Sequence, residues 1–198
     1  MDPERVLSFW FGELDADGLA QPARSKQWWT KDEAFDARVR DEFLEDHREI
    51  VAEHREHWLV DSRGRLAYIV VLDQFSRNMF RGTPQSFASD PQALRAARGG
   101  IEKGADKALA VAERTFMYMP YMHSESLEDQ DRCIELFTAL RDELEGKARD
   151  NAEYSLKFAN MHRDIIVKFG RFPHRNAILG RATTPEEAKF LEGPGSSF

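Results

Sequence analysis

The chain has 198 residues, a formal net charge of −7 at pH 7 and a single cysteine, Cys133. An acidic chain argues against non-specific binding to nucleic acid and to anionic membrane surfaces. The longest apolar run, residues 67–72, is far shorter than the ~20 residues that cross a membrane, and one cysteine excludes an internal disulfide. We therefore expect a cytoplasmic protein without a nucleic-acid or membrane partner.

The N-terminal part of the chain reads as helices separated by a loop. Asp2-Pro3 supplies an N-cap acceptor followed by proline at the first helical position. Thr30 and Glu33 have the spacing of a capping box, which marks the start of a charged helix. The elements expected here are a helix over residues 2–12, a loop over 18–25 and a helix over 30–57.

A mostly apolar stretch, residues 65–76, predicts the helix at the centre of the core. Its apolar residues fall on most sides of a helix, which is typical of a buried element. A strand over residues 68–72 is the alternative, because β-branched residues gather there. The polar pair Asp73-Gln74 continues in helical register, so we favour the helix.

The rest of the chain predicts five further helices. Ser126 with Asp129, and Asp150 with Glu153, have capping-box spacing, and Gly170 is placed to end the longest helix. The expected helices run over residues 90–104, 113–122, 126–144 and 150–170, with a short last one from residue 184.

No segment shows the alternation of a β-strand, and the turn clusters separate helices. We predict an all-α fold with about eight or nine helices. The expected organisation is a single domain over residues 1–192 and a frayed tail over residues 193–198.

Five stretches resemble one bacterial family, catalogued as "domain of unknown function 924". They are VLSFWFG (6–12), QWWTKDEAFD (27–36), LDQFSRNMFRGTPQSFASDPQAL (72–94), MYMPYMHSESLEDQDRCIELF (117–137) and HRDIIVKFGRFPHRNAILGR (162–181). The resemblance implies a right-handed α-α array similar to tetratricopeptide-repeat proteins, in which antiparallel helix pairs stack side by side. It implies no established activity.

Asp73 and Arg77 stand four residues apart on the predicted core helix, in one stripe with apolar positions. Because buried charges need partners, our first interpretation is a structural ion pair between them. The alternative is that Arg77 and Asn78 bind a ligand, since the helix gives way to a loop at this point.

A second polar group lies at the end of the helix that Pro120 bends. It holds Tyr121, His123 and Glu125, followed by the cap position Ser126. His123 with Glu125 would supply an imidazole and the carboxylate that orients it, as general acid–base catalysis requires. Helix capping is the alternative, because a histidine suits a helix C-terminus. Both interpretations stay open, and Tyr121 is a ligand-binding candidate.

His162 lies within the apolar face of the longest helix, between Phe158 and Ile166 in angle around its axis. A histidine in that position is commonly a core residue whose hydrogen bonds are satisfied. As the alternative, burial would favour its neutral form and make it a catalytic base.

The stretch after this helix adds four ligand-binding candidates, Arg171, His174, Arg175 and Asn176. Cations near a helix C-terminus offset its dipole, which accounts for Arg171. The other three lie beyond Pro173, outside the reach of the last turn. Because a planar guanidinium suits carboxylates and phosphates, the partners are either protein acids or an anionic ligand. The protein acids that would serve are Asp73, Glu125 and Asp129.

Standard catalytic and cofactor motifs are absent: the sequence has no glycine-rich phosphate loop, no G-x-S-x-G, no H-E-x-x-H and no dinucleotide fingerprint. We therefore predict no cofactor. Cys133 lies among apolar residues, where a thiolate is disfavoured. His47, His54 and His57 share one charged helix face, which we interpret as solvated rather than as a metal site.

The residues support three functional hypotheses. The first is a helical-repeat binding module whose cationic pocket holds an acidic peptide or a small anionic molecule. The second is a hydrolase of an anionic substrate, with His162 or His123 as general base and arginines that stabilise developing charge. In the third, the polar motifs only join helix ends. The sequence predicts no oligomeric state.

Overall fold

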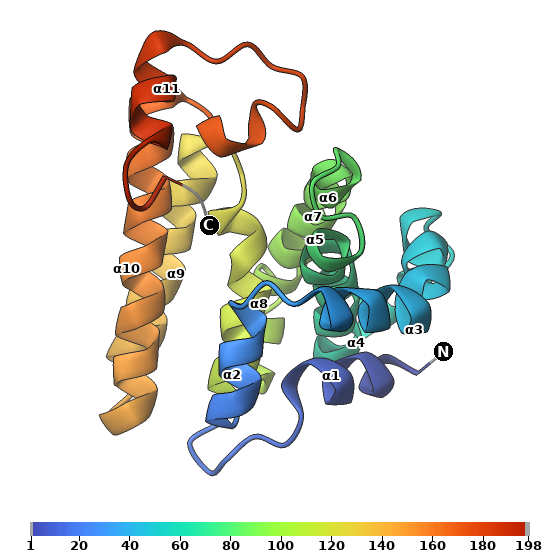
Figure 1. The fold of residues 1–198 in the computed structure, drawn as a ribbon. Helices are drawn as coiled ribbons and strands as arrows, with labels where there is room; N and C mark the ends of the chain where they lie inside the picture. Colours follow the sequence, from blue (N-terminus) through green and yellow to red (C-terminus); the bar gives the residue numbers. More distant parts are fainter. Residues whose placement is uncertain (1, 197–198) are drawn as a thin grey trace.

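The computed structural model describes residues 2–196 and is made of helices (Figure 1). The α-helices are α1 (Pro3–Phe11), α2 (Pro22–Trp28), α3 (Glu33–Val51), α4 (Ser62–Val70), α5 (Ser76–Met79), α6 (Gln85–Ala88), α7 (Asp90–Ile101), α8 (Val111–Met122), α9 (Leu127–Asp142), α10 (Gly146–Phe169) and α11 (Pro185–Leu191). The 3₁₀ helices are η1 (Glu56–Val60), η3 (Ala105–Ala108) and η4 (Pro173–Arg175), and η2 (Val71–Phe75) is π-helical. Between residues 2 and 196 the β pairing amounts to one isolated bridge, from Leu14 to Ala20. The all-α prediction is confirmed.

The segments α4, η2 and α5 follow one another along the chain and form the centre of the core. Leu66, Val70 and Phe75 on these segments are fully buried. Helices α1, α3, α7 and α8 pack around them. The expected central helix over residues 65–76 is therefore present, and the strand alternative is wrong.

Helices α9 and α10 form an antiparallel pair that packs on α8 (Figure 1). Cys133, Phe137 and Leu140 bury the inner face of α9. Burial raises the pKa of the Cys133 thiol, so this thiol stays protonated. None of the helices within residues 2–196 is both long enough and apolar enough to cross a membrane.

A second, smaller apolar cluster lies at the C-terminal end of α10. Its buried members are Ile165, Ile166 and Phe172, with Phe169 and Phe190 packed against them. Since Phe190 belongs to α11, this cluster fixes α11 to the end of α10.

The expected helix ends in this region are present. Gly170 ends α10 in the left-handed conformation, and Thr184 with Glu187 forms the capping box of α11. Of the predicted tail over residues 193–198, the last two residues lie outside the described part. Within it, the Ser196 hydroxyl donates to the Leu191 carbonyl oxygen at 3.2 Å.

Two expectations near the N-terminus are wrong. The predicted loop over residues 18–25 contains the start of α2, which is anchored because the Trp28 indole donates to the Trp10 carbonyl oxygen at 2.9 Å. The cap of α3 is Asp32 rather than Thr30, since the Asp32 carboxylate accepts from two backbone amides of the first turn.

Helix α3 is also shorter than expected. It ends at Val51 instead of near residue 57, because Glu53 adopts a φ of 63° that turns the chain into η1. His47 does not belong to a solvated face: it is buried, and its Nε2 lies 2.9 Å from the Ser76 hydroxyl oxygen.

Two cap assignments in the second half are wrong as well. Helix α10 begins at Gly146, one turn before the expected start at Asp150. The Ser126 side chain does not cap α9, and Asp129 accepts a hydrogen bond from Arg98 on α7 instead of completing a capping box. Asp129, which the local spacing predicts as part of a cap, thus pairs with a cation that is distant in sequence.

The chain is closely packed around Gly64 at the start of α4, and a substitution there tests this packing. An added Cβ there would lie 2.5 Å from the carbonyl oxygen of Trp58. That oxygen belongs to the backbone and cannot easily move, so Gly64→Ala should lower the free energy of unfolding by about 1–3 kcal/mol. Urea unfolding followed by circular dichroism measures the change.

Gly99→Ala on α7 is the matched control. The nearest atom to a Cβ at Gly99 is 3.6 Å away, and alanine favours a helix over glycine by up to about 1 kcal/mol. This variant should be neutral or more stable than wild type. An equal loss of stability in both variants would contradict the packing described for Gly64.

Candidate functional site

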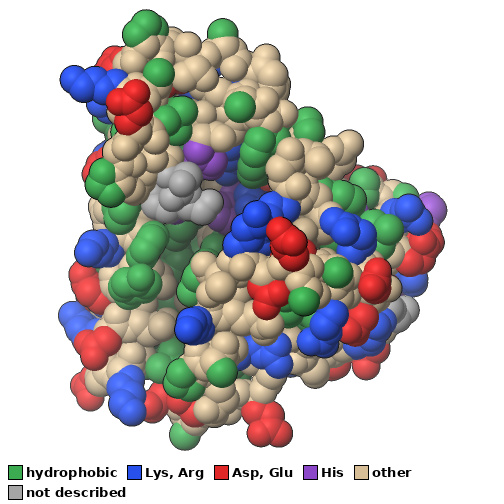
Figure 2. All heavy atoms as spheres, viewed as in Figure 1, with side chains coloured by type: hydrophobic (Ala, Val, Ile, Leu, Met, Phe, Trp, Pro, Cys, Tyr) green, Lys and Arg blue, Asp and Glu red, His purple; other side chains and the backbone are tan. Residues whose placement is uncertain are grey.

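Four charged side chains and one histidine, from several elements, meet where the C-terminal end of α8 faces α5, α7 and η4. They are Asp73 on η2, Arg77 on α5, Asp90 on α7, His123 just after α8, and Arg175 on η4. We call these five residues the polar cluster. Figure 2 shows histidine side chains with arginine or lysine side chains beside them in a hollow on this face of the molecule.

Asp73 is the buried centre of the polar cluster, with 1 % of its side chain exposed. One carboxylate oxygen lies 2.7 Å from Nδ1 of His123 and 3.2 Å from the Arg77 guanidinium. The other oxygen accepts a hydrogen bond from the Gln74 amide at 2.5 Å. Burial alone would raise the pKa of Asp73, but Arg77 and His123 outweigh it and hold that pKa well below its usual range. Asp73 is therefore a carboxylate at neutral pH.

A π-helical turn carries Asp73. The central helix changes from α to π over η2 and returns to α at α5. Such turns are rare and recur at functional sites, because they change the direction in which side chains leave the helix. Here the turn places Asp73 against the end of α8 while Arg77, four residues later, still reaches the same carboxylate.

Arg77 has all the acidic partners that its planar fork can use. Its two terminal nitrogens donate to the two oxygens of Asp90 at 2.9 and 3.1 Å, and one of them also donates to the Asp73 carbonyl oxygen at 2.7 Å. The ion pair expected between Asp73 and Arg77 is present at 3.2 Å. Arg77 thus links the central helix to α7.

Arg175 is much less well paired. Its side chain is 8 % exposed, and its one acidic contact within residues 2–196 is a 3.4 Å approach to an Asp90 oxygen that Arg77 already uses. The guanidinium lies 4.6 Å from the ring centres of both Phe87 and Phe172. Its Nε is buried and has no hydrogen-bond partner among residues 2–196. Burial, followed by the nearby Arg77, lowers the pKa of Arg175 to about 10.

His123 is held as one tautomer. Because the Asp73 carboxylate accepts the hydrogen bond, Nδ1 carries the proton and Nε2 keeps its lone pair. Burial lowers the pKa of His123, Arg77 lowers it further, and Asp73 only partly restores it, so the ring is neutral at pH 7. No residue of the described chain hydrogen-bonds to Nε2.

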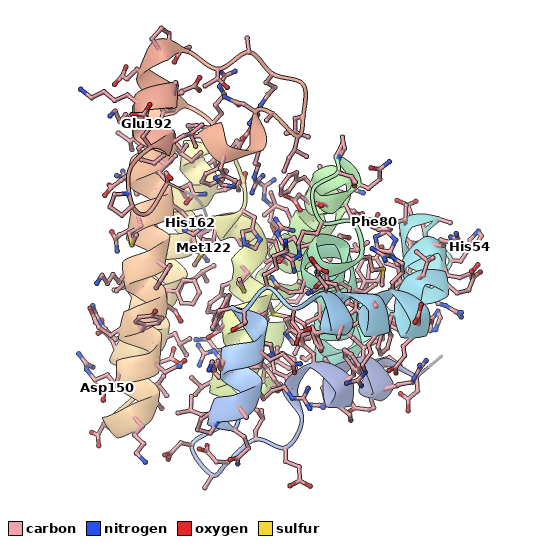
Figure 3. All side chains as sticks on the ribbon, in the orientation of Figure 1. His54, Phe80, Met122, Asp150, His162 and Glu192 are labelled. Atoms are coloured by element: carbon pink, nitrogen blue, oxygen red, sulfur yellow. The ribbon has the colours of Figure 1, made fainter. Side chains whose placement is uncertain are left out.

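Two more histidines adjoin the polar cluster. The ring centre of His162 lies 6.3 Å from that of His123, and Phe172 separates His162 from His174 at 5.6 Å from each. His162 Nδ1 donates to the Phe158 carbonyl oxygen at 2.8 Å. Burial lowers the pKa of His162 to about 3 and that of His174 to about 4, so both rings are neutral. Figure 3 shows His162 on α10 beside Met122 at the end of α8.

Glu125 is not the carboxylate that orients His123, and that expectation is wrong. Glu125 accepts from the Arg181 guanidinium at 2.7 Å and from the Phe172 backbone amide at 2.8 Å. Asn176, expected in the ligand site, accepts from the same arginine at 2.9 Å. These residues form a brace that holds the loop after α10 against the end of α8.

The remaining predicted site residues also lie outside the polar cluster. Arg171 forms a two-pronged pair with Glu187 of α11 at 2.7 and 2.9 Å. The Asn78 amide donates to Asp36 on α3 at 2.7 Å. Tyr121 is buried in α8, where burial raises the pKa of its hydroxyl, and no described hydrogen bond joins that hydroxyl to the cluster.

Sequence reasoning missed Asp90 and Phe87. Asp90-Pro91 reads as an ordinary helix start, because acids favour helix N-termini, and nothing near Phe87 marks it as a partner for a cation. Within residues 2–196, no three histidine, cysteine or acidic side chains are placed to hold a metal ion.

The comparisons with known proteins agree with the fold. The family model described as "Bacterial protein of unknown function (DUF924)" matches residues 6–195. The chain belongs to this family. A solved structure of a protein of unknown function from Agrobacterium tumefaciens is 37 % identical, with a TM-score of 0.78 over 96 % of this chain and 97 % of that chain. Among curated proteins, no sequence matches.

Membership of the DUF924 family confirms the resemblance found in the five sequence stretches. The family description records no activity, and neither does the description of the Agrobacterium structure. The polar cluster is therefore the feature of the molecule that bears on its function.

Removing the Asp73 carboxylate should be costly. Asp73→Ala leaves Arg77 and His123 without their central acceptor, and losing one member of a buried pair costs about 3 kcal/mol or more. Chemical unfolding at pH 7 measures the loss. Because the pKa of Asp73 is lowered in the folded state, its contribution is complete above the ordinary carboxyl pKa of about 4 and shrinks as the pH falls further.

Asp131→Ala is the control for a pair at the surface. Asp131 accepts from Arg163 at 2.5 Å, but its side chain is 49 % exposed. Exposed pairs contribute less than about 1 kcal/mol. A loss in Asp73→Ala no larger than in this control would show that the buried carboxylate is not a structural centre.

Proposed function

We propose that the hollow beside the polar cluster binds a small anionic molecule. The observation that carries the proposal is Arg175, a desolvated guanidinium with an unsatisfied buried Nε and a shared, distant acid. Burying a charge without a full set of partners is costly, and the oxygens of a carboxylate, sulfate or phosphate would supply what is missing. The neighbouring acids do not, because Arg77 already engages both of them.

The charges of the polar cluster favour a ligand with few negative charges. Two carboxylates, Asp73 and Asp90, face two guanidinium groups, and the three nearby histidines are neutral. The cluster is thus balanced before a ligand enters. A monoanion needs only the under-paired Arg175, whereas a dianion would draw protons onto the histidines.

A small molecule suits this position better than an acidic peptide. Arg175 is 8 % exposed, and its guanidinium lies 4.6 Å from the ring centres of both Phe87 and Phe172. An extended chain would have to reach past these rings, while a single carboxylate can enter edge-on toward the guanidinium. Binding of an acidic peptide instead would be detected by the titrations described below.

We also retain the tetratricopeptide-repeat-like array and the cytoplasmic location as proposals. The antiparallel pair α9–α10 stacked on α8 supports the first, since such arrays present ligand sites on the faces of stacked helices. The lone, buried Cys133 supports the second, because a disulfide is not needed for stability.

Sulfate titration tests anion binding directly. In calorimetric titrations at constant ionic strength, both sulfate and acetate should bind the wild-type protein saturably. Arg175→Met keeps the contact with both phenyl rings but removes the charge. It should weaken binding about 10-fold or more, as expected for a lost charge-assisted hydrogen bond.

Arg163→Met is the matched control, because Arg163 pairs with Asp131 at the surface and no described contact joins it to the polar cluster. It should bind sulfate as wild type does. The absence of saturable binding, or equal binding by Arg175→Met, would refute the proposal. Binding of short acidic peptides far more tightly than of small anions would replace the small ligand with a peptide.

Sulfate affinity should rise as the pH falls from about 6.5 to about 4.5, toward the lowered pKa values of the nearby histidines. Sulfate keeps its two charges over this range, so any change reports on the protein. The titratable and charged groups near the ligand are His123, His162, His174, Asp73, Asp90, Glu125, Arg77 and Arg175. The histidine pKa values are lowered in the free protein, and a bound dianion raises them, so binding takes up protons. Equal affinity at every pH would contradict this account.

A further inference from the structure

The proposed anion site also contains a proton acceptor that binding alone does not require. His123 Nδ1 lies 2.7 Å from Asp73, whose carboxylate is fixed by Arg77 at 3.2 Å and by Gln74 at 2.5 Å. Asp73 cannot turn away without losing these contacts. The His123 ring is therefore held in position, and its basic Nε2 has no hydrogen-bond partner within residues 2–196.

This pair has the arrangement by which enzymes use histidine as a base. A buried carboxylate that accepts from Nδ1 sets the tautomer and stabilises the imidazolium that forms when Nε2 takes a proton. In the polar cluster the carboxylate stays charged throughout, because Arg77 remains beside it. Asp73 is thus a positioning residue, and His123 is the group that would contact the reactants.

The nucleophile is water, because the nearby side chains that could serve are otherwise engaged. The hydroxyl of Ser124, the next residue along the chain, donates to Asp129 at 2.6 Å. Cys133 is fully buried in the core, and burial raises its pKa. A water molecule at Nε2 would meet a substrate whose charged end is bound by Arg175.

We propose that the polar cluster hydrolyses a small carboxylic ester that carries one free carboxylate. This inference rests on the proposed anion site. Arg175 binds the free carboxylate, and Nε2 of His123 takes a proton from water as the water oxygen bonds to the ester carbon. The bond from that carbon to the alcohol oxygen then breaks, and the imidazolium returns the proton to the leaving oxygen. The products are a second carboxylic acid and an alcohol, so atoms and electrons balance.

The charge balance explains why a carboxylic ester is chosen over a phosphate ester. Arg175 is the one under-paired cation in a cluster whose formal charges already balance, so it suits one negative charge. A phosphate monoester brings about two charges at neutral pH, and the second charge would face the carboxylates of Asp73 and Asp90.

The test follows release of 4-nitrophenolate from the mono-4-nitrophenyl esters of succinic and glutaric acids by the full chain. Release should be saturable, competitively inhibited by acetate, and at least 10-fold more efficient than release from neutral 4-nitrophenyl acetate. 4-Nitrophenyl phosphate should not be turned over; if it is preferred instead, the substrate class proposed here is wrong.

Three variants separate the roles. His123→Asn can still donate to Asp73 but has no basic nitrogen, so kcat should fall at least 100-fold, a typical contribution of a general base. Arg175→Met should mainly raise KM. Asp73→Asn should lower kcat with little change in KM and move the pH profile of kcat, which a purely structural role would not do. His54→Gln, an exposed histidine on another part of the surface, should keep full activity.

The binding and the catalytic proposals can fail separately. If wild type binds sulfate but releases no 4-nitrophenolate from either anionic ester, or if His123→Asn releases it at the wild-type rate, the catalytic inference is wrong and the binding proposal stands. If sulfate and acetate do not bind, the binding proposal fails first. Sulfate binding by His123→Asn within about 3-fold of wild type shows that the variant is folded.

Discussion

The described fold and its candidate site depend on the contacts that the buried carboxylate of Asp73 makes. A charge so deep in the core is tolerable only with close partners, and Asp73 has Arg77 and His123. Arg77 continues to Asp90 on α7, and Asp90 is in turn approached by Arg175 on η4. One carboxylate therefore connects the central helix to α7, α8 and the C-terminal loop.

Other ion pairs explain why the basic stretch after α10 is mostly unavailable to a ligand. Arg171 and Arg181 are paired with Glu187 and Glu125, and these pairs hold α11 and the loop in place. Among the arginines of this stretch, Arg175 is then the one with a buried nitrogen that lacks a hydrogen-bond partner within residues 2–196. The proposed ligand site depends on this difference, because the paired arginines hold the loop in place while Arg175 keeps an unsatisfied nitrogen.

Local patterns predicted the helices and several site residues, but not how those residues pair. The four-residue spacing of Asp73 and Arg77 and the apolar flanks of His162 are local signals, and the structure places these residues accordingly. The pairing of Asp73 with His123 spans 50 positions, and that of Arg175 with Asp90 spans 85. No periodicity encodes such distances, so the sequence offers only Glu125, the nearest acid along the chain, as a possible partner of His123.

The tautomer of His123 gives the most direct test of this account. Long-range ¹H–¹⁵N NMR of the histidine side chains distinguishes a protonated Nδ1 from a protonated Nε2. The account predicts that at neutral pH His123 is neutral, with the proton on Nδ1 and a bare Nε2, and that Asp73→Asn yields a mixture of tautomers. A proton on Nε2, or a doubly protonated ring at neutral pH, would contradict it.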